Sequence, residues 1–200
     1  MRNSEFRFTE NEGWKLIMRR AGKEFEKEIR DSLKNTKNIY WERFFDFNTI
    51  NAVLQSLKGL SNKMGKGTKL KNYFLIQPPK QPADYWVVRK GDIYFFECKK
   101  TILPNAFPFK NIKLHQFDSA FNMNKNGGNY IFFLNKRNIP LHFRCFAVRG
   151  IYLWKLKEVD KKNEITWDEL DRLAKEGGNV LELERLPKGR WRIEKIFDYW

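Results

Sequence analysis

The chain of 200 residues is long enough for one domain with a hydrophobic core, since 42% of its residues are hydrophobic and 16% aromatic. No stretch approaches the ~18 uncharged apolar residues of a membrane-spanning helix, and residues 1–11 lack the apolar centre of a signal peptide. The 39 Lys and Arg residues outnumber the 24 Asp and Glu residues, which gives a net charge of +15. This excess predicts a polyanionic partner: nucleic acid first, a membrane surface second. A merely soluble basic protein is the alternative.

Cysteine and histidine usage indicates a reducing compartment. Cys98 and Cys145 lie inside apolar runs, which is typical of buried strand thiols and not of disulfides or a zinc site. His115 and His142 have no metal-ligand spacing. We therefore expect a cytoplasmic protein that uses neither zinc nor iron.

The first part of the chain predicts helix, strand and helix. Residues 12–35 form a long helix in this prediction, because apolar residues recur at spacings of three and four. The stripe consists of Trp14, Met18, Ala21, Phe25, Ile29 and Leu33. An aromatic strand is expected at 39–45, a second helix at 48–60, and a turn-rich basic stretch at 61–71.

The remaining elements follow the same patterns. A hairpin of two strands, 83–89 and 93–99, is predicted around Lys90-Gly91, followed by an irregular connection at 101–112. A helix at 113–124 is expected to end at Gly127-Gly128. Later segments predict strands at 130–134, 142–148 and 151–156, a helix at 166–176 capped by Thr166 and Glu169, and edge strands within 180–200. This order predicts an α/β fold with a central mixed β-sheet flanked by helices.

The hairpin brings charged side chains together. If Lys90-Gly91 is the turn, Asp84 lies opposite Glu97; if Gly91-Asp92 is the turn, Asp84 lies opposite Lys99. In both registers Asp84, Glu97 and Lys99 share one face, because side chains alternate along a strand. Two carboxylates and one ammonium are therefore expected to converge.

Such a cluster is costly unless something compensates the charge. Two partly buried carboxylates on one face repel each other. Hard cations such as Mg²⁺ bind one or two carboxylates together with water and phosphate oxygens, and such an ion activates water for hydrolysis. The alternative is purely structural, with Asp84 capping a turn and Glu97 and Lys99 forming an ordinary edge-strand pair. The hairpin geometry, the apolar residues before Glu97 and the positive net charge favour the metal site.

Five stretches resemble the PD-(D/E)xK nuclease superfamily and, within it, RecU-type Holliday-junction resolvases. They are residues 22–26, which end in Glu26; 82–84, which end in Asp84; 97–99, the Glu-x-Lys pair; 99–112; and His115-Gln116. The resemblance runs from about residue 22 to 134. It implies a restriction-endonuclease-like core and an endodeoxyribonuclease that needs Mg²⁺, with Mn²⁺ able to substitute.

The resemblance also implies a role for each residue. Asp84 and Glu97 bind the metal, Lys99 stabilises the transition state, Gln116 joins the metal shell, and Glu26 supports the site from the first helix. His115 is expected to contact DNA or to be structural. One position departs from the family, which tends to have a small hydroxyl residue where this chain has Pro82. Metal affinity or preference is therefore expected to differ here.

A one-sided run of positive charge precedes the hairpin. Residues 47–83 contain no Asp or Glu, and five of their lysines are expected to contact DNA: Lys58, Lys63, Lys66, Lys69 and Lys71. The run lies where RecU-like proteins carry a protruding stalk. We therefore expect one nuclease domain, 1–200, with a basic stalk insertion at about 47–82; a flexible basic loop is the alternative.

The resulting hypothesis is a structure-selective endonuclease that resolves four-way DNA junctions by paired nicking. Paired nicks suit a two-fold homodimer, with Trp41 and Phe44 as candidates for its surface or for the core. One alternative is a restriction- or repair-type endonuclease acting on duplex DNA. Another is a non-catalytic DNA-binding protein on the same fold. No membrane role is expected.

Overall fold

The computed structural model describes residues 10–44, 81–138 and 142–200. Six strands form one sheet in the order β1-β2-β3-β5-β6-β8, in which only β3 and β5 are parallel neighbours. The bounds are β1 (Tyr40–Arg43), β2 (Tyr85–Arg89), β3 (Asp92–Thr101), β5 (Asn129–Asn138), β6 (His142–Arg149) and β8 (Val180–Leu183). The predicted mixed sheet is therefore confirmed.

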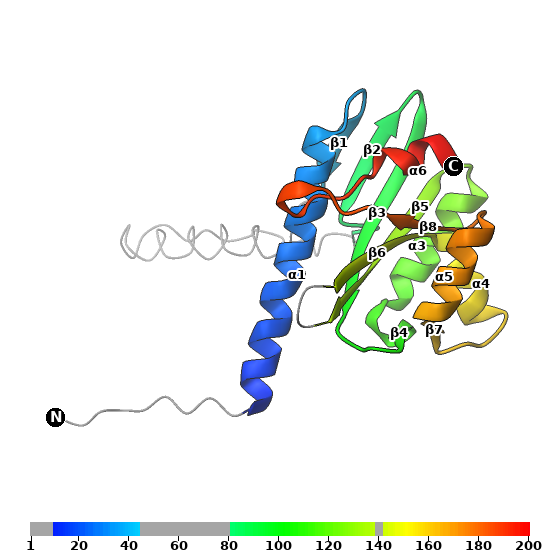
Figure 1. The fold of residues 1–200 in the computed structure, drawn as a ribbon. Coiled ribbons are helices and arrows are strands. Elements are labelled where there is room, and N and C mark those ends of the chain that lie inside the picture. Colours follow the sequence, from blue (N-terminus) through cyan, green and yellow to red (C-terminus); the bar gives the residue numbers. More distant parts are fainter. Residues whose placement is uncertain (1–9, 45–80, 139–141) are drawn as a thin grey trace, which may run out of the picture.

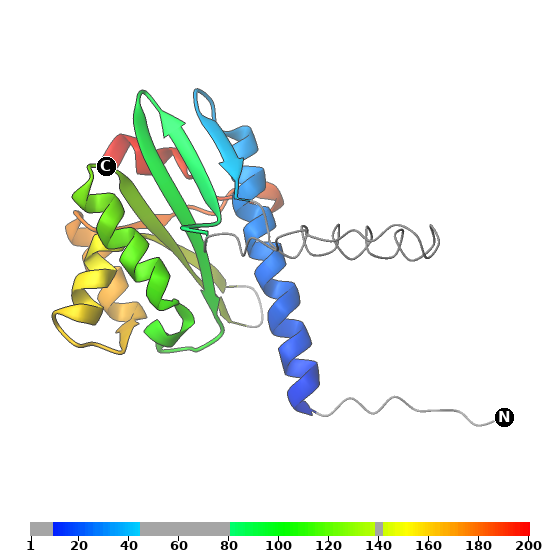
Figure 2. The same cartoon turned by 180° about the vertical axis from the view of Figure 1, so that it is seen from behind.

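Helices cover both faces of this sheet (Figure 1). They are α1 (Glu10–Asn35), α3 (Leu114–Lys125), α4 (Gly150–Glu158), α5 (Trp167–Glu176) and α6 (Glu194–Tyr199). Figure 2 shows α1 on one side of the sheet, with α3, α4 and α5 on the other. No helix in the described part of the chain is long and apolar enough to cross a membrane.

The long first helix packs through the predicted apolar stripe. Phe25, Ile29 and Leu33 are fully buried in one core cluster with Val87 of β2 and Phe96 of β3. The side chains of the earlier stripe residues lie outside the described part. Spacings of three and four residues thus place one side of α1 against the sheet and leave its other side to solvent.

The hairpin adopts the first of the two predicted registers, in which Asp84 lies opposite Glu97. Arg89 pairs with Asp92 and Tyr85 with Phe96, so Lys90 and Gly91 form the two-residue turn. Both turn residues have positive φ, 52° at Lys90 and 93° at Gly91. This is the turn geometry whose twist matches that of the flanking strands.

Two predicted helix ends are confirmed. The helix α3 ends with Gly127 at φ 79°, while the N–H of Gly128 donates to the carbonyl of Met123 at 2.9 Å. At the start of α5, the hydroxyl of Thr166 accepts a hydrogen bond from the backbone N–H of Glu169 at 3.1 Å.

The predicted strand at 151–156 is wrong, because this segment belongs to the helix α4. Its short apolar run also fits a helix, in which Leu153 and Leu156 are three residues apart and both buried. Gly150 begins the helix where a Cβ atom would lie 2.7 Å from that of Ala120 and 3.0 Å from the carbonyl oxygen of Tyr130. The close approach of α4 to α3 and β5 therefore requires glycine here.

Two other segments differ from expectation. Of residues 180–200, only β8 forms an edge strand. The helix α6 follows it, and Ile196 of α6 is buried in the same core cluster as α1.

The irregular connection at 101–112 contains a short strand, β4 (Ala106–Pro108), and one turn of 3₁₀ helix, η1 (Phe109–Asn111). The strand β4 pairs with β7 (Glu164–Thr166). A second short 3₁₀ helix, η2, spans Pro187–Gly189. The predicted helix at 48–60 and the basic stretch at 61–71 lie outside the described residues.

Candidate active site

Asp84 extends β2 by one residue and is fixed on both sides. Its N–H donates to the carbonyl of Phe96 on β3, and its carbonyl accepts from the N–H of Phe44, each at 3.0 Å. Its side-chain Oδ2 accepts a hydrogen bond of 2.7 Å from the N–H of Cys98. Two backbone hydrogen bonds therefore hold Asp84 between Phe44 and β3, and a third ties its carboxylate to β3.

Glu97 lies on β3 with two donors on one of its oxygens. Lys99 Nζ lies 2.8 Å from Oε1 of Glu97, and the amide Nε2 of Gln116 donates to the same oxygen at 2.6 Å. The Glu97 side chain is almost fully buried, at 4% exposure. The predicted sharing of one strand face by Glu97 and Lys99 thus brings them into an ion pair, as side-chain alternation requires.

Burial and mutual repulsion make the two carboxylates hard to ionise together. Burial raises the pKa of Asp84 to about 7, and the negative charge of Glu97 adds to this increase. Burial likewise raises the pKa of Glu97, while Lys99 and Gln116 oppose the increase. Oδ1 of Asp84 and Oε2 of Glu97 make no hydrogen bond within the described part of the chain. The site therefore has two carboxylate oxygens to offer to a cation, in addition to the oxygen that pairs with Lys99.

Gln116 is held in place by the start of α3. Its Oε1 accepts a hydrogen bond of 3.0 Å from the N–H of Lys113, which is the N-terminal cap of the helix. Its NH₂ group therefore points at Glu97. His115, the neighbouring residue, is half-buried on the same helix.

Glu26 reaches the site from α1 and pairs with β1. Its Oε2 lies 2.8 Å from the guanidinium of Arg43. Glu26 and Asp84 line the same cavity, of about 500 Å³, between α1 and the beginning of β2. The complete lining is Lys23, Glu26, Lys27, Arg30, Arg43, Phe44, Gln81, Asp84 and Tyr85.

Tyr130 is a site neighbour that the sequence did not reveal. Its hydroxyl donates a hydrogen bond of 2.5 Å to the carbonyl of Pro82, two residues before Asp84. The ring of Tyr130 is buried against Phe95 and Phe132. This contact depends on the parallel pairing of β3 with β5, which no local pattern encodes.

The residues present fit a hard divalent cation. Within 10–44, 81–138 and 142–200, no group of three or more His, Cys, Asp or Glu side chains is arranged to hold a metal ion. Magnesium does not need such a group, because it is usually bound through one or two carboxylates, with water and phosphate oxygens completing the shell. Asp84 and Glu97 supply two carboxylates whose charge is incompletely compensated.

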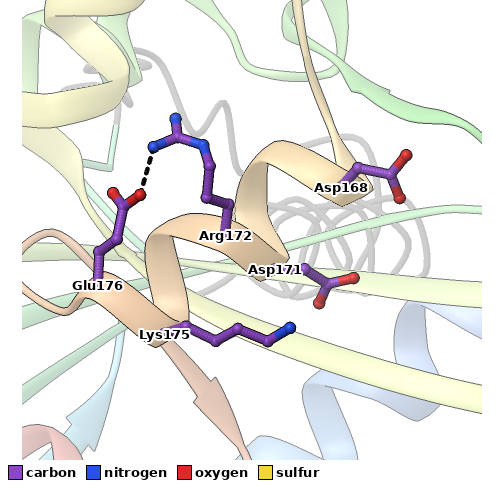
Figure 3. Close-up of a pocket in the computed structure, with 5 residues that line it drawn as sticks. All are labelled: Asp168, Asp171, Arg172, Lys175 and Glu176. Atoms are coloured by element: carbon purple, nitrogen blue, oxygen red, sulfur yellow. Dashed lines mark hydrogen bonds and ion pairs between the residues drawn. The ribbon is translucent and has the colours of Figure 1, made fainter.

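A second cavity lies on α5 and has a different character. Its lining residues all belong to one helix, and Arg172 is paired with Glu176 at 2.6 Å (Figure 3). Asp171 is engaged by Arg144, with one hydrogen bond of 2.9 Å. Three carboxylates and two cations line this cavity, so its charges compensate each other and the balance does not favour an anion.

Several other expectations concern residues near or outside the site. Cys145 is fully buried, whereas Cys98 is only partly buried, and both thiols are free. Trp41 and Phe44 are half-buried and pack against the core, Phe44 by stacking on Phe95 at 5.7 Å. The five lysines expected to bind DNA, from Lys58 to Lys71, lie outside the described residues.

Comparison with known proteins agrees with the resemblance seen in the motifs. The family model of recombination protein U, RecU, matches residues 21–179, which is well over half of the chain. No curated protein sequence matches the chain. The matched region contains every residue of the site just described. The chain belongs to the RecU family of recombination proteins, a family of Holliday-junction resolvases.

Proposed function

We propose that this protein is a metal-dependent endonuclease that resolves four-way DNA junctions by paired nicking, with its active centre at Asp84, Glu97 and Lys99. One observation carries the proposal: the buried carboxylate of Glu97 and the half-buried carboxylate of Asp84 each keep one oxygen without a hydrogen bond in the described part of the chain. A restriction-endonuclease-like core of the PD-(D/E)xK type is part of the proposal. The net charge of +15 supports a nucleic-acid substrate.

Asp84 and Glu97 would hold the ion, which we propose to be Mg²⁺, with Mn²⁺ able to substitute. When bound, such an ion polarises the scissile phosphate and makes water a better nucleophile. Both side chains must be deprotonated before they can act as ligands. The burial that raises the pKa of Asp84 therefore ties ion binding to proton release.

Lys99 would act on the reacting groups from the same strand face. Its ammonium lies 2.8 Å from Glu97 and remains partly accessible, at 15% exposure. From this position it helps to orient the attacking water and balances the negative charge that builds up on the phosphate.

Three further residues would assist. The hydrogen bond from Gln116 fixes the orientation of Glu97, and Gln116 joins the metal shell. Glu26 supports the site from α1 through its pair with Arg43. His115 would contact DNA beside the site.

Substrate choice would depend on the basic insertion and on assembly. Lys58, Lys63, Lys66, Lys69 and Lys71 would neutralise phosphates near the branch point, on a stalk at about 47–82 within one nuclease domain. A homodimer would supply the two active sites that paired nicking requires. Such an enzyme would act on branched or four-way-junction DNA in the cytoplasm.

The proposal is tested with labelled four-way junction and matched linear duplex, each incubated with Mg²⁺ and with EDTA. We expect symmetric nicks on two junction strands of like polarity, in Mg²⁺ alone. Cleavage of the duplex but not of the junction would support a restriction- or repair-type enzyme. Binding without cleavage in either Mg²⁺ or Mn²⁺ would support a non-catalytic DNA-binding protein.

A further inference from the structure

The cavity between α1 and β2 is bordered by an unusual number of cations. Lys23, Lys27 and Arg30 project into it from α1, and Arg43 lines it from the end of β1. Glu26 and Asp84 are the two carboxylates in its lining, and Glu26 is already paired with Arg43. The cavity therefore carries an excess of positive charge directly beside the candidate active centre.

The three cations of α1 form one stripe, because residues three and four apart share a helix face. Glu26 lies between this stripe and the buried stripe of Phe25 and Ile29. Within the described residues, Lys23, Lys27 and Arg30 make no ion pair. The Nε atom of Arg30 is buried without a hydrogen-bond partner in this part of the chain. This stripe of cations has no ion-pair partner in the described residues, and one cation keeps an unsatisfied donor. Such a surface can bind an anion.

We propose that this cavity binds backbone phosphates of the DNA strand that is cut, next to the scissile phosphate at Asp84 and Glu97. The inference rests on the proposed function and assigns new residues, Lys23, Lys27 and Arg30, to the path of the cleaved strand. Lysine acts on a phosphate as a point charge, whereas the planar arginine group can bind one with two donors. Asp84 is the residue common to the cavity and the active centre, so a strand lying in the cavity leads directly to the reacting bond.

The cavity on α5 provides an internal contrast (Figure 3). It also contains a lysine, Lys175, and an arginine, Arg172, but three carboxylates accompany them. In the cavity beside α1 the balance is reversed, because four cations accompany two carboxylates. Lys175 is exposed on its helix, as Lys27 is, which makes Lys175→Ala a matched control for Lys27→Ala.

The first test measures junction affinity in EDTA over a range of salt concentrations. Lys27→Ala should weaken binding about 3- to 10-fold and reduce the slope of log K against log salt by roughly 0.7–0.9, the value for one lost phosphate contact. Lys27→Arg should restore both quantities, and Lys175→Ala should change neither. An unchanged slope in Lys27→Ala, or an equal loss in Lys27→Arg, would overturn the inference.

The second test locates the contact on the substrate. Single neutral methylphosphonate linkages are placed on either side of the cleaved bond, in the cut strand and in its complement. If Lys27 contacts a phosphate of the cut strand, neutralising that phosphate weakens binding by wild type but not by Lys27→Ala, because the two losses are coupled. Additive losses at every position in the cut strand would overturn the inference.

The same series separates this inference from the proposed function. Wild-type protein is incubated with the unmodified junction and Mg²⁺. Cleavage together with additive losses contradicts the phosphate site alone. Absence of cleavage contradicts the proposed function. It then also contradicts the assignment of this cavity to the cleaved strand, because no strand is cleaved.

Discussion

The amide of Gln116 donates a hydrogen bond of 2.6 Å to Oε1 of Glu97, and its own oxygen accepts from the N–H of Lys113 at 3.0 Å. The start of α3 is thereby locked to a carboxylate of β3. Because Lys99 approaches the same oxygen, Oε2 of Glu97 is the atom left to bind an ion.

Gln116→Ala should lower junction cleavage about 10- to 100-fold, which is the usual cost of losing a residue that orients a metal ligand. Junction affinity in EDTA should stay within twofold of wild type. Raising the Mg²⁺ concentration should recover part of the activity, since a poorly oriented Glu97 binds the ion more weakly. Asp118→Asn, an exposed change on the same helix, serves as the control. Full activity of Gln116→Ala at low Mg²⁺ would contradict this role.

Lys99→Ala should reduce kcat for cleavage by about 100- to 1000-fold, as the loss of a preorganised charge at the reacting group does elsewhere. The variant should still bind the junction. Lys99 also lowers the pKa of Glu97, so the variant's residual activity should require a higher pH than wild-type activity. Rates measured between pH 6 and 9, with Lys125→Ala for comparison, check both effects. Retention of the wild-type rate would refute the assignment of Lys99.

The pKa of Asp84 has a consequence for stability. It is about 7 in the folded chain against an ordinary value of 3.8, so between these values the folded protein holds a proton that the unfolded protein has released. The free energy of unfolding should therefore fall as the pH rises through this interval, and the penalty should be complete above pH 7.

Asp84→Asn removes this penalty and can still accept the hydrogen bond from Cys98. In EDTA at pH 8 the variant should be more stable than wild type by about 2 kcal/mol, and at pH 4 the difference should largely disappear. Urea unfolding at the two pH values provides the measurement. Asp160→Asn, at an exposed site, should show no such difference. Equal stability of Asp84→Asn and wild type at pH 8 would show that ionised Asp84 does not destabilise the folded protein.

Tyr130→Phe should loosen the segment that carries Asp84. The change removes the hydroxyl that donates to the carbonyl of Pro82, at a cost of roughly 1–2 kcal/mol in unfolding free energy. It should also raise the Mg²⁺ concentration needed for half-maximal cleavage. Tyr152→Phe, on α4, is the matched control, because no hydrogen bond of its hydroxyl is found within the described residues. An unchanged Mg²⁺ requirement would show that the Tyr130 hydroxyl does not position Asp84.

The hairpin could be predicted from sequence because its geometry is local. Alternation along two strands and the positive φ that glycine accepts at Gly91 fix which residues face each other. The place of Gln116 at the metal site was implied only by resemblance, and its hydrogen bond to Glu97 was not predicted, since α3 reaches β3 through long-range packing. The cation row on α1 was missed for the same reason: its meaning depends on where the helix lies relative to Asp84.

The error at 151–156 has a different origin. A nearly continuous apolar run as short as this one fits a buried strand and a buried helix equally well. Tertiary contacts determine that the segment is helical. The strand β8 occupies the sheet position beside β6, and Gly150 allows a helix to start close to Ala120. Neither fact can be read from the segment itself.

The central claim is tested most directly by measuring binding and cleavage of one four-way junction by wild type and Asp84→Asn. We predict that the variant binds the junction with an affinity within about threefold of wild type and that its cleavage in Mg²⁺ falls by at least roughly 1000-fold. Cleavage by Asp84→Asn at a rate near that of wild type would show that the reaction does not depend on this carboxylate and would contradict the proposed active centre.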